Sequence, residues 1–174
     1  MAVYAHSRRS PDKEGWQELR EHLHGAAALG MEFAPEAMKS QAYLAGLWHD
    51  VGKYQLAFQH YIGVTPEASN ETNQAVHSVP HSAAGAALAL ERFGPENPGG
   101  LALALVIEAH HGALKSLRSI VDVLEQRGKS LLSDARKGGL PPALEETEMG
   151  VLPPPHFSAM EFASSFRLLL TRIC

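Results

Sequence analysis

The stretch GLWHDVGK, residues 46–53, places a histidine and an aspartate in the middle of an apolar helical pattern. One face of this expected helix is apolar at helical spacing and carries Leu44, Leu47, Trp48 and Val51. The opposite face carries His49, Asp50 and Lys53 among the small residues Ala42, Ala45 and Gly46. Small residues indicate the close approach of another helix, so His49 and Asp50 are expected to face a buried seam. A buried carboxylate is costly unless it is paired or bound to a metal.

The bulk properties of the chain fit one globular domain. It has 174 residues, of which 45% are hydrophobic, which is enough for a sizeable core. The net charge of −4 argues against a polybasic nucleic-acid binder, although it leaves room for a local basic patch. Cys174 is the single cysteine, and no signal peptide or membrane span is recognisable. We therefore expect a cytoplasmic protein with no membrane partner.

Alanine and leucine are abundant and β-branched runs are almost absent, which predicts an all-α fold. The expected helices cover roughly residues 16–33, 35–52, 82–93, 101–111 and 115–136. A last helix is expected to begin near Ser158, an N-cap residue with Glu161 three positions later. Gly112 is expected to be the C′ residue of the helix over 101–111. Residues 61–80 and 137–155 contain proline and glycine among polar residues and are expected to be loops.

Ten histidines are the unusual feature of the composition, and histidine is the commonest metal ligand in proteins. Those on or beside apolar helices are His22, His24, His49, His81, His110 and His111. Taken singly, a His-Asp pair is usually a surface pair, and a histidine doublet suits the C-terminus of a helix. Taken together, imidazoles from four helices and the Asp50 carboxylate favour a metal site for Mn, Fe, Co, Ni or Zn. The remaining histidines, including His6 and His60, lie in polar or terminal contexts, where no site role is expected.

The ordered set of these histidines around Asp50 resembles the HD superfamily of metal-dependent phosphohydrolases. More narrowly, it resembles the HD nuclease domain of the CRISPR-associated type I nuclease–helicase. The supporting stretches are YAHS, WQELREHL, LAGLWHDVGKYQLAFQHYI, HSVPHSAAGAALAL and VIEAHHG, which extend from Tyr4 to Gly112, and more weakly FASSFRLLLTRIC. The resemblance implies a single HD-superfamily helical domain over residues 1–174, with a metal site between its central helices.

The resemblance also implies roles for individual residues. The implied metal ligands are His22, His49, Asp50, His81, His110 and His111. Asp50 would bridge two metal ions, and His24 is the alternative to His22 on the first helix. Lys53 would act electrostatically near the phosphate, although it could instead be an ordinary solvated lysine. The implied cofactor is one or two divalent transition-metal ions, namely Mn, Fe, Co or Ni, with Mg as a further option.

The sequence departs from the family pattern in two places. The family's last metal ligand is an aspartate on the final helix, and no acid follows FRLLLTRIC. Asp122 and Asp134 do not match its position. We therefore expect the metal group of His22 and His49 to be weakened and cleavage to be impaired. No G-x-x-x-x-G-K-[ST] motif occurs, so these residues are not expected to include an ATP-binding helicase domain.

The function implied by the resemblance is that of a metal-dependent endo- or exodeoxyribonuclease, which cleaves single-stranded DNA in CRISPR type I interference. The implied partners are single-stranded DNA, a CRISPR helicase domain or subunit, and the RNA-guided surveillance complex. Candidates for contact with the DNA backbone are Arg8, Arg9, Lys13 and Lys53. Two alternatives remain open. One is another HD phosphohydrolase that acts on nucleotides or cyclic dinucleotides, and the other is an inactive HD-fold adaptor.

Overall fold

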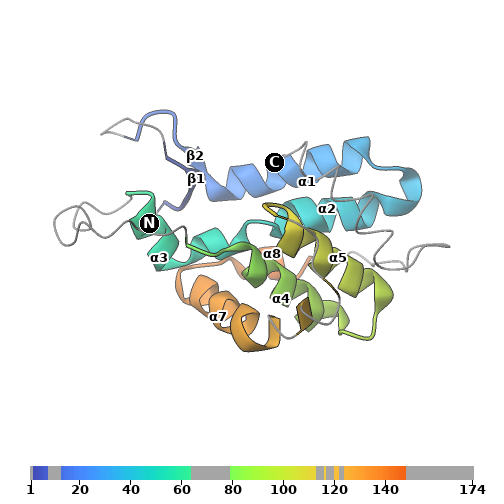
Figure 1. The fold of residues 1–174 in the computed structure, drawn as a ribbon. Helices are drawn as coiled ribbons and strands as arrows, with labels where there is room; N and C mark the ends of the chain where they lie inside the picture. Colours follow the sequence, from blue (N-terminus) through green and yellow to red (C-terminus); the bar gives the residue numbers. More distant parts are fainter. Residues whose placement is uncertain are drawn as a thin grey trace.

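The computed structural model describes residues 2–7, 13–63, 79–112, 116, 120–121 and 124–147. Their regular secondary structure is helical apart from one antiparallel pair of short strands, β1 (Tyr4–His6) and β2 (Gln17–Glu18). The helices are α1 (Leu19–Phe33), α2 (Lys39–Trp48), α3 (Leu56–Tyr61), α4 (Ser82–Phe93), α5 (Pro98–Ala109), α7 (Lys129–Lys137) and α8 (Pro142–Glu145) (Figure 1). The 3-10 turns η1 (Glu36–Met38) and η2 (Val51–Tyr54) flank α2, and the π-helical turn η4 (Leu124–Gly128) leads into α7. The prediction of an all-α fold is confirmed.

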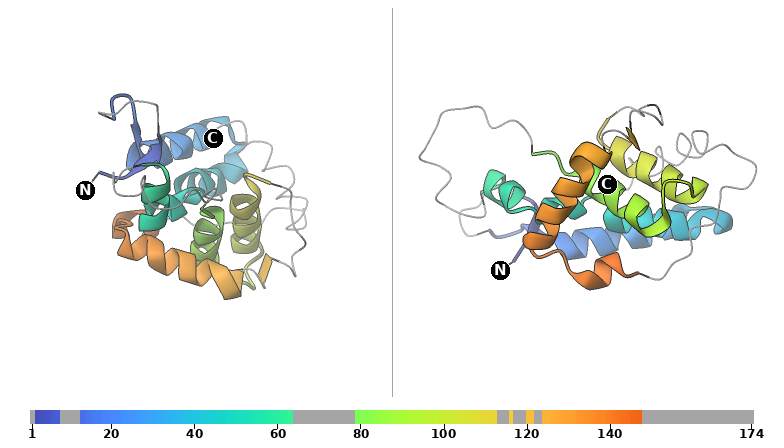
Figure 2. Two further views of the ribbon diagram at one scale, coloured as in Figure 1. Left: turned by 60° about the vertical axis from the view of Figure 1, so that its left-hand side comes forward. Right: turned by 90° about the horizontal axis from the view of Figure 1, so that it is seen from below.

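Helix α2 is the centre of the arrangement, with α1 on one side and the α4–α5 pair on the other (Figures 1 and 2). Gly46 lets α1 approach, because a Cβ atom at this position would lie 2.6 Å from the backbone of Ala26. Gly85 lets α4 approach the end of α2, because a Cβ atom there would overlap the carbonyl oxygen of Trp48. The close helix approach predicted from the small residues beside His49 and Asp50 is therefore confirmed.

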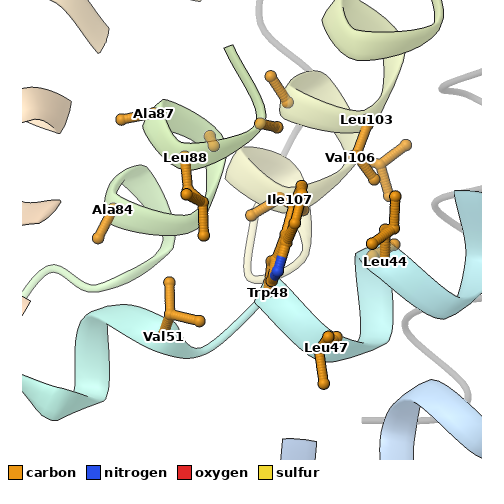
Figure 3. Close-up of a cluster of buried hydrophobic side chains, with 14 of the residues drawn as sticks. Leu44, Leu47, Trp48, Val51, Ala84, Ala87, Leu88, Leu103, Val106 and Ile107 are labelled. Carbon is orange, nitrogen blue, oxygen red and sulfur yellow. The ribbon is translucent and has the colours of Figure 1, made fainter. Parts of the chain in front are cut away.

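Leu44, Trp48 and Val51 point toward α4 and α5, whereas Leu47 points toward α1 (Figure 3). Leu44, Leu47, Trp48 and Val51 are fully buried. Figure 3 shows the indole of Trp48 projecting from α2 toward α4 and α5, near Leu88 and Ile107. The indole nitrogen of Trp48 also donates a hydrogen bond to the carbonyl oxygen of Leu144, at 2.8 Å, which attaches α8 to the end of α2. The core thereby fixes the end of α2, where the His49-Asp50 pair begins.

Several element boundaries differ from those predicted. The first helix begins at Leu19 because Gln17 and Glu18 pair with β1. The helix expected over residues 35–52 is divided, since Asp50 has φ −116° and ψ 13° and a separate 3-10 turn follows it. The loop expected over residues 137–155 contains the single-turn helix α8. Of the loop expected over residues 61–80, the structure describes residues 61–63 and 79–80 but not residues 64–78.

Helix α5 begins three residues before the predicted start. Asn97 is its N-cap, and the Asn97 side chain accepts hydrogen bonds from the N–H groups of Gly99 and Gly100, at 2.9 and 3.1 Å. His110 is its C-cap, so Gly112 is not the C′ residue. The helix expected near Ser158 lies outside the described residues. In the described parts of the chain, every helix is too short or too polar to cross a membrane.

Candidate metal centre

Side chains from four helices meet around Asp50, which lies just beyond α2. His49 is the C-cap of α2, His81 is the N-cap of α4, and His110 is the C-cap of α5. His22 comes from the buried face of α1. His24, the alternative on the same helix, is exposed and lies outside the cluster. The structure therefore brings the six predicted ligands together, and it places His22, not His24, among them.

The two carboxylate oxygens of Asp50 face two different groups of imidazoles. The Oδ2 atom lies 3.2 Å from Nε2 of His22 and 3.2 Å from Nε2 of His49. The Oδ1 atom lies 3.2 Å from Nε2 of His81 and 3.5 Å from Nε2 of His110. His111 joins the second group, because its Nε2 lies 2.9 Å from Nε2 of His81. One group is therefore Asp50 with His81, His110 and His111, and the other is Asp50 with His22 and His49.

Three of the imidazoles are held in one tautomer by backbone carbonyls. The Nδ1 atoms of His49, His81 and His110 lie 2.8, 3.0 and 2.6 Å from the carbonyl oxygens of Gly46, Val79 and Ile107. A carbonyl oxygen only accepts hydrogen bonds, so each Nδ1 carries a proton, and a ring in its neutral form directs its Nε2 lone pair toward Asp50. Lone pairs directed at a carboxylate repel it unless a cation lies between them. A metal-binding histidine usually donates its other ring N–H to such a carbonyl oxygen.

The burial of Asp50 and His49 also supports a metal-binding site. Asp50 is 2% exposed and His49 is 0% exposed. Asp50 Oδ1 and His110 Nε2 make no hydrogen bond within the part of the chain that the structure describes. A buried polar atom without a partner is destabilising, and a divalent cation bound by both atoms would remove that cost. The donor set of imidazole nitrogens and one carboxylate therefore fits a first-row transition metal.

Comparison with known proteins places the chain in a family. The sequence profile of the family described as Cas3, HD domain, matches residues 12–149, which is more than half of the chain. The chain belongs to the Cas3 HD domain family. This confirms the resemblance seen in the sequence, and HD domains of this family are metal-dependent hydrolase domains.

Solved structures include a partial counterpart of this HD domain. A structure described as the crystal structure of a CRISPR-associated protein aligns with 98% of this chain, at 17% sequence identity and a TM-score of 0.45. This HD domain spans 26% of the length of that chain. No curated protein matches the chain significantly.

The electrostatics of the HD domain favour the metal-binding forms of two ligands, Asp50 and His111. Burial of the Asp50 carboxyl favours its neutral form, but the imidazoles of His49, His110 and His22 outweigh burial and hold its pKa well below the usual range. Partial burial, with His110 and His81 nearby, lowers the pKa of His111 to about 4. At neutral pH Asp50 is therefore a carboxylate and His111 a neutral imidazole, the states that coordinate a metal ion.

Lys53 is part of this cluster and is not a solvated lysine. It is 4% exposed, and its Nζ atom lies 2.6 Å from Oδ2 of Asp50. The ammonium group also lies 5.5 Å from the ring centre of Phe58. The alternative interpretation of Lys53 as an ordinary surface residue is wrong, because η2 turns the side chain inward beside Asp50.

His6 also lies at the cluster, although no site role is expected from its position near the N-terminus. Its ring centre is 5.0 Å from that of His22, in an edge-to-face arrangement. Partial burial of its ring, followed by the nearby charges of Lys53 and His22, lowers the pKa of His6, although the residue as a whole is exposed. The signals in the sequence are the place of His6 in YAHS, one of the stretches that support the family resemblance, and the strand alternation of Tyr4 and His6, which puts both side chains on one face. Three residues are too few for that alternation to be convincing.

The other residues considered from the sequence lie elsewhere. Asp134 is on α7, where its carboxylate pairs with Nζ of Lys137 at 2.9 Å. Lys13 lies with its Nζ atom 5.9 Å from the ring centre of Tyr4, on the β1 side of the molecule. The remaining ones lie outside the described residues, namely Arg8, Arg9 and Asp122.

Proposed function

We propose that this HD domain is a metal-dependent phosphodiesterase that cleaves single-stranded DNA in CRISPR type I interference. The observation that carries the proposal is the division of Asp50, whose two oxygens each face a separate group of imidazoles. One carboxylate shared by two nitrogen-rich groups suits a pair of divalent ions acting on one phosphodiester. Membership of the Cas3 HD domain family supports the CRISPR context.

The residues present fit the metal ions that such an activity needs. His81, His110 and His111 would hold one ion with Asp50, and His22 and His49 would hold the other with the same carboxylate. Divalent ions such as Mn, Fe, Co or Ni supply Lewis acidity toward a phosphodiester and lower the pKa of bound water.

The protein itself contributes orientation and charge. The carbonyl oxygens of Gly46, Val79 and Ile107 fix three rings so that Nε2 is the free donor atom. The Asp50 carboxylate supplies the one negative charge at the centre of the described ligands. Lys53 places a buried ammonium beside Oδ2, where it can attract the phosphate of a substrate. Apolar packing of α2 against α4 and α5 surrounds these groups and limits their exposure to water.

Single-stranded DNA suits this site better than a duplex. Asp50, His22, His49 and His110 are buried near helix ends, so a phosphate must enter between helices to reach them. A flexible single strand can adopt that path, whereas a stiff duplex cannot. The partners that follow from this proposal are a helicase domain or subunit that supplies single strands and an RNA-guided surveillance complex, in the cytoplasm.

The test is cleavage of circular single-stranded DNA by the protein loaded with Mn²⁺, without ATP. We expect slow cleavage, because the described residues give the His22–His49 group only three donors. Asp50→Ala should abolish cleavage, whereas Asp134→Ala should leave it unchanged because Asp134 pairs only with Lys137 among the described contacts. Faster hydrolysis of mononucleotides or cyclic dinucleotides than of DNA would favour another HD phosphohydrolase. Bound metal without any hydrolysis would favour an inactive adaptor.

A further inference from the structure

The short strand β1 lies beside the His22–His49 group, with His6 against His22. We infer that His6, at the end of this strand, is a substrate-contacting residue whose imidazole donates a hydrogen bond to a non-bridging oxygen of the phosphodiester. The inference rests on the proposed function, because it concerns the substrate of the same site. It adds a contact that belongs to neither group of metal ligands.

The position of His6 suits contact with a substrate rather than with a metal ion. Its ring meets the ring of His22 edge to face, with centres 5.0 Å apart and planes at 89°. His22 and His49 are buried, whereas His6 is exposed and lies at the rim of the group. Among the described residues, the two groups of possible metal ligands do not include His6. An imidazole carries at least one N–H group in either protonation state, so a donor is always present at this rim.

A buried side chain fixes β1 in place. Gln59 on α3 is 1% exposed, and its amide pairs with both backbone groups of Tyr4. The Tyr4 N–H donates to Oε1 at 3.0 Å, and Nε2 donates to the Tyr4 carbonyl at 2.9 Å. The same Nε2 atom also donates to the carbonyl oxygen of Lys53 at 2.8 Å. One glutamine therefore ties the strand that carries His6 to the turn that carries Lys53.

The charge on this side of Asp50 also favours an anion. Lys53 contacts Oδ2 of Asp50, which is the oxygen that faces His22 and His49. Among the described residues, this group has three donors, one of which is the carboxylate that it shares with the other group. A divalent ion bound here would leave a net positive charge. A phosphate at this position would meet the ammonium of Lys53 and the N–H of His6 from the protein.

The experiment compares His6→Ala, His6→Phe and His6→Gln with the wild-type protein, all loaded with Mn²⁺. Phenylalanine keeps a ring against His22 but removes the donor, and glutamine keeps a donor but removes the ring. The readouts are bound Mn²⁺, kcat and KM for bis(p-nitrophenyl) phosphate and circular single-stranded DNA, and the affinity for a phosphorothioate oligothymidylate by fluorescence anisotropy. His24→Ala is the matched control, because His24 is an exposed histidine of α1.

We expect His6→Ala and His6→Phe to weaken oligothymidylate binding and to raise KM by about tenfold, with bound Mn²⁺ unchanged. His6→Gln should recover part of the loss, and Gln59→Leu should reproduce it because β1 is released. Wild-type behaviour of His6→Phe would show that His6 only packs against His22 and would overturn the inference. Loss of Mn²⁺ from His6→Ala would overturn it as well. Absence of hydrolysis by the wild type would count against the proposed function alone, since the binding measurement still decides the role of His6.

Discussion

The two halves of the candidate metal centre share one carboxylate but differ in what surrounds it. On the Oδ1 side, three imidazoles complete a group of four donors with Asp50. On the Oδ2 side, His22 and His49 make a group of three with the same residue. The side with fewer donors is the one that carries the ammonium of Lys53 and the ring of His6. The difference indicates that one half mainly holds a metal ion, whereas the other half also faces the substrate.

The largest effect is expected where both halves meet. Asp50→Asn keeps the size of the side chain but removes its charge, which leaves the Lys53 ammonium buried without its anion. We expect the metal-free variant to lose about 3–5 kcal/mol of unfolding free energy. When Mn²⁺ is added, the variant should bind no ion in either group. Urea denaturation and elemental analysis measure the two effects.

Asp134→Asn is the matched control for this substitution. Asp134 pairs with Lys137 on the surface of α7, and both side chains are largely exposed. Loss of this ion pair should lower the free energy of unfolding by less than about 1 kcal/mol. Equal losses in the two variants would mean that the ion pair of Asp50 behaves like a surface pair, against the structure.

The next effect separates the two halves from each other. His110→Ala removes a buried ligand from the group of four and should lower the affinity of the tighter site by at least about 10–100-fold. His22→Ala should leave that site intact and remove only the weaker one. Equilibrium dialysis with Mn²⁺ at increasing concentration distinguishes these outcomes. A loss of the tighter site in His22→Ala would reverse the assignment of the halves.

The smallest effect is a pH dependence of the metal-free protein. The pKa of His111 falls from 6.5 to about 4 on folding, so between these values the unfolded chain takes up a proton that the folded chain does not. Stability should therefore decrease as the pH falls from about 6.5 to about 4. The low pKa of Asp50 adds a further loss as the pH falls below about 3.8, because the aspartate of the unfolded chain then takes up a proton while the folded carboxylate stays ionised. In excess chelator, the Tm of His111→Asn should fall less steeply than that of the wild type as the pH decreases from about 6.5 to about 4.

Much of this centre follows from the sequence because its residues lie in strong helical patterns. Small residues beside His49 and Asp50 predict the seam between helices, and the apolar helix before His110 predicts a buried C-terminal end. These signals are local, within one or two turns of each residue. The ligands form a cluster because the ends of these helices come together in the fold.

The rest of the site depends on contacts that a local pattern does not contain. Gln59 reaches Tyr4 across 55 positions of the chain, and β1 is only three residues long. His6 and Gln59 lie in stretches that support the family resemblance, but no helical pattern around either residue indicates that it belongs to the site. The inward turn of Lys53 likewise depends on the backbone of Asp50, which leaves the helical region at φ −116°.

The central claim is that two unequal metal groups share Asp50. Its most direct test is an equilibrium titration of the metal-free protein with Mn²⁺, in which the free ion is followed by its electron paramagnetic resonance signal. We predict two classes of site per chain, one at least about tenfold tighter than the other, and both absent in Asp50→Asn. A single site, two sites of equal affinity, or undiminished binding by Asp50→Asn would contradict the claim.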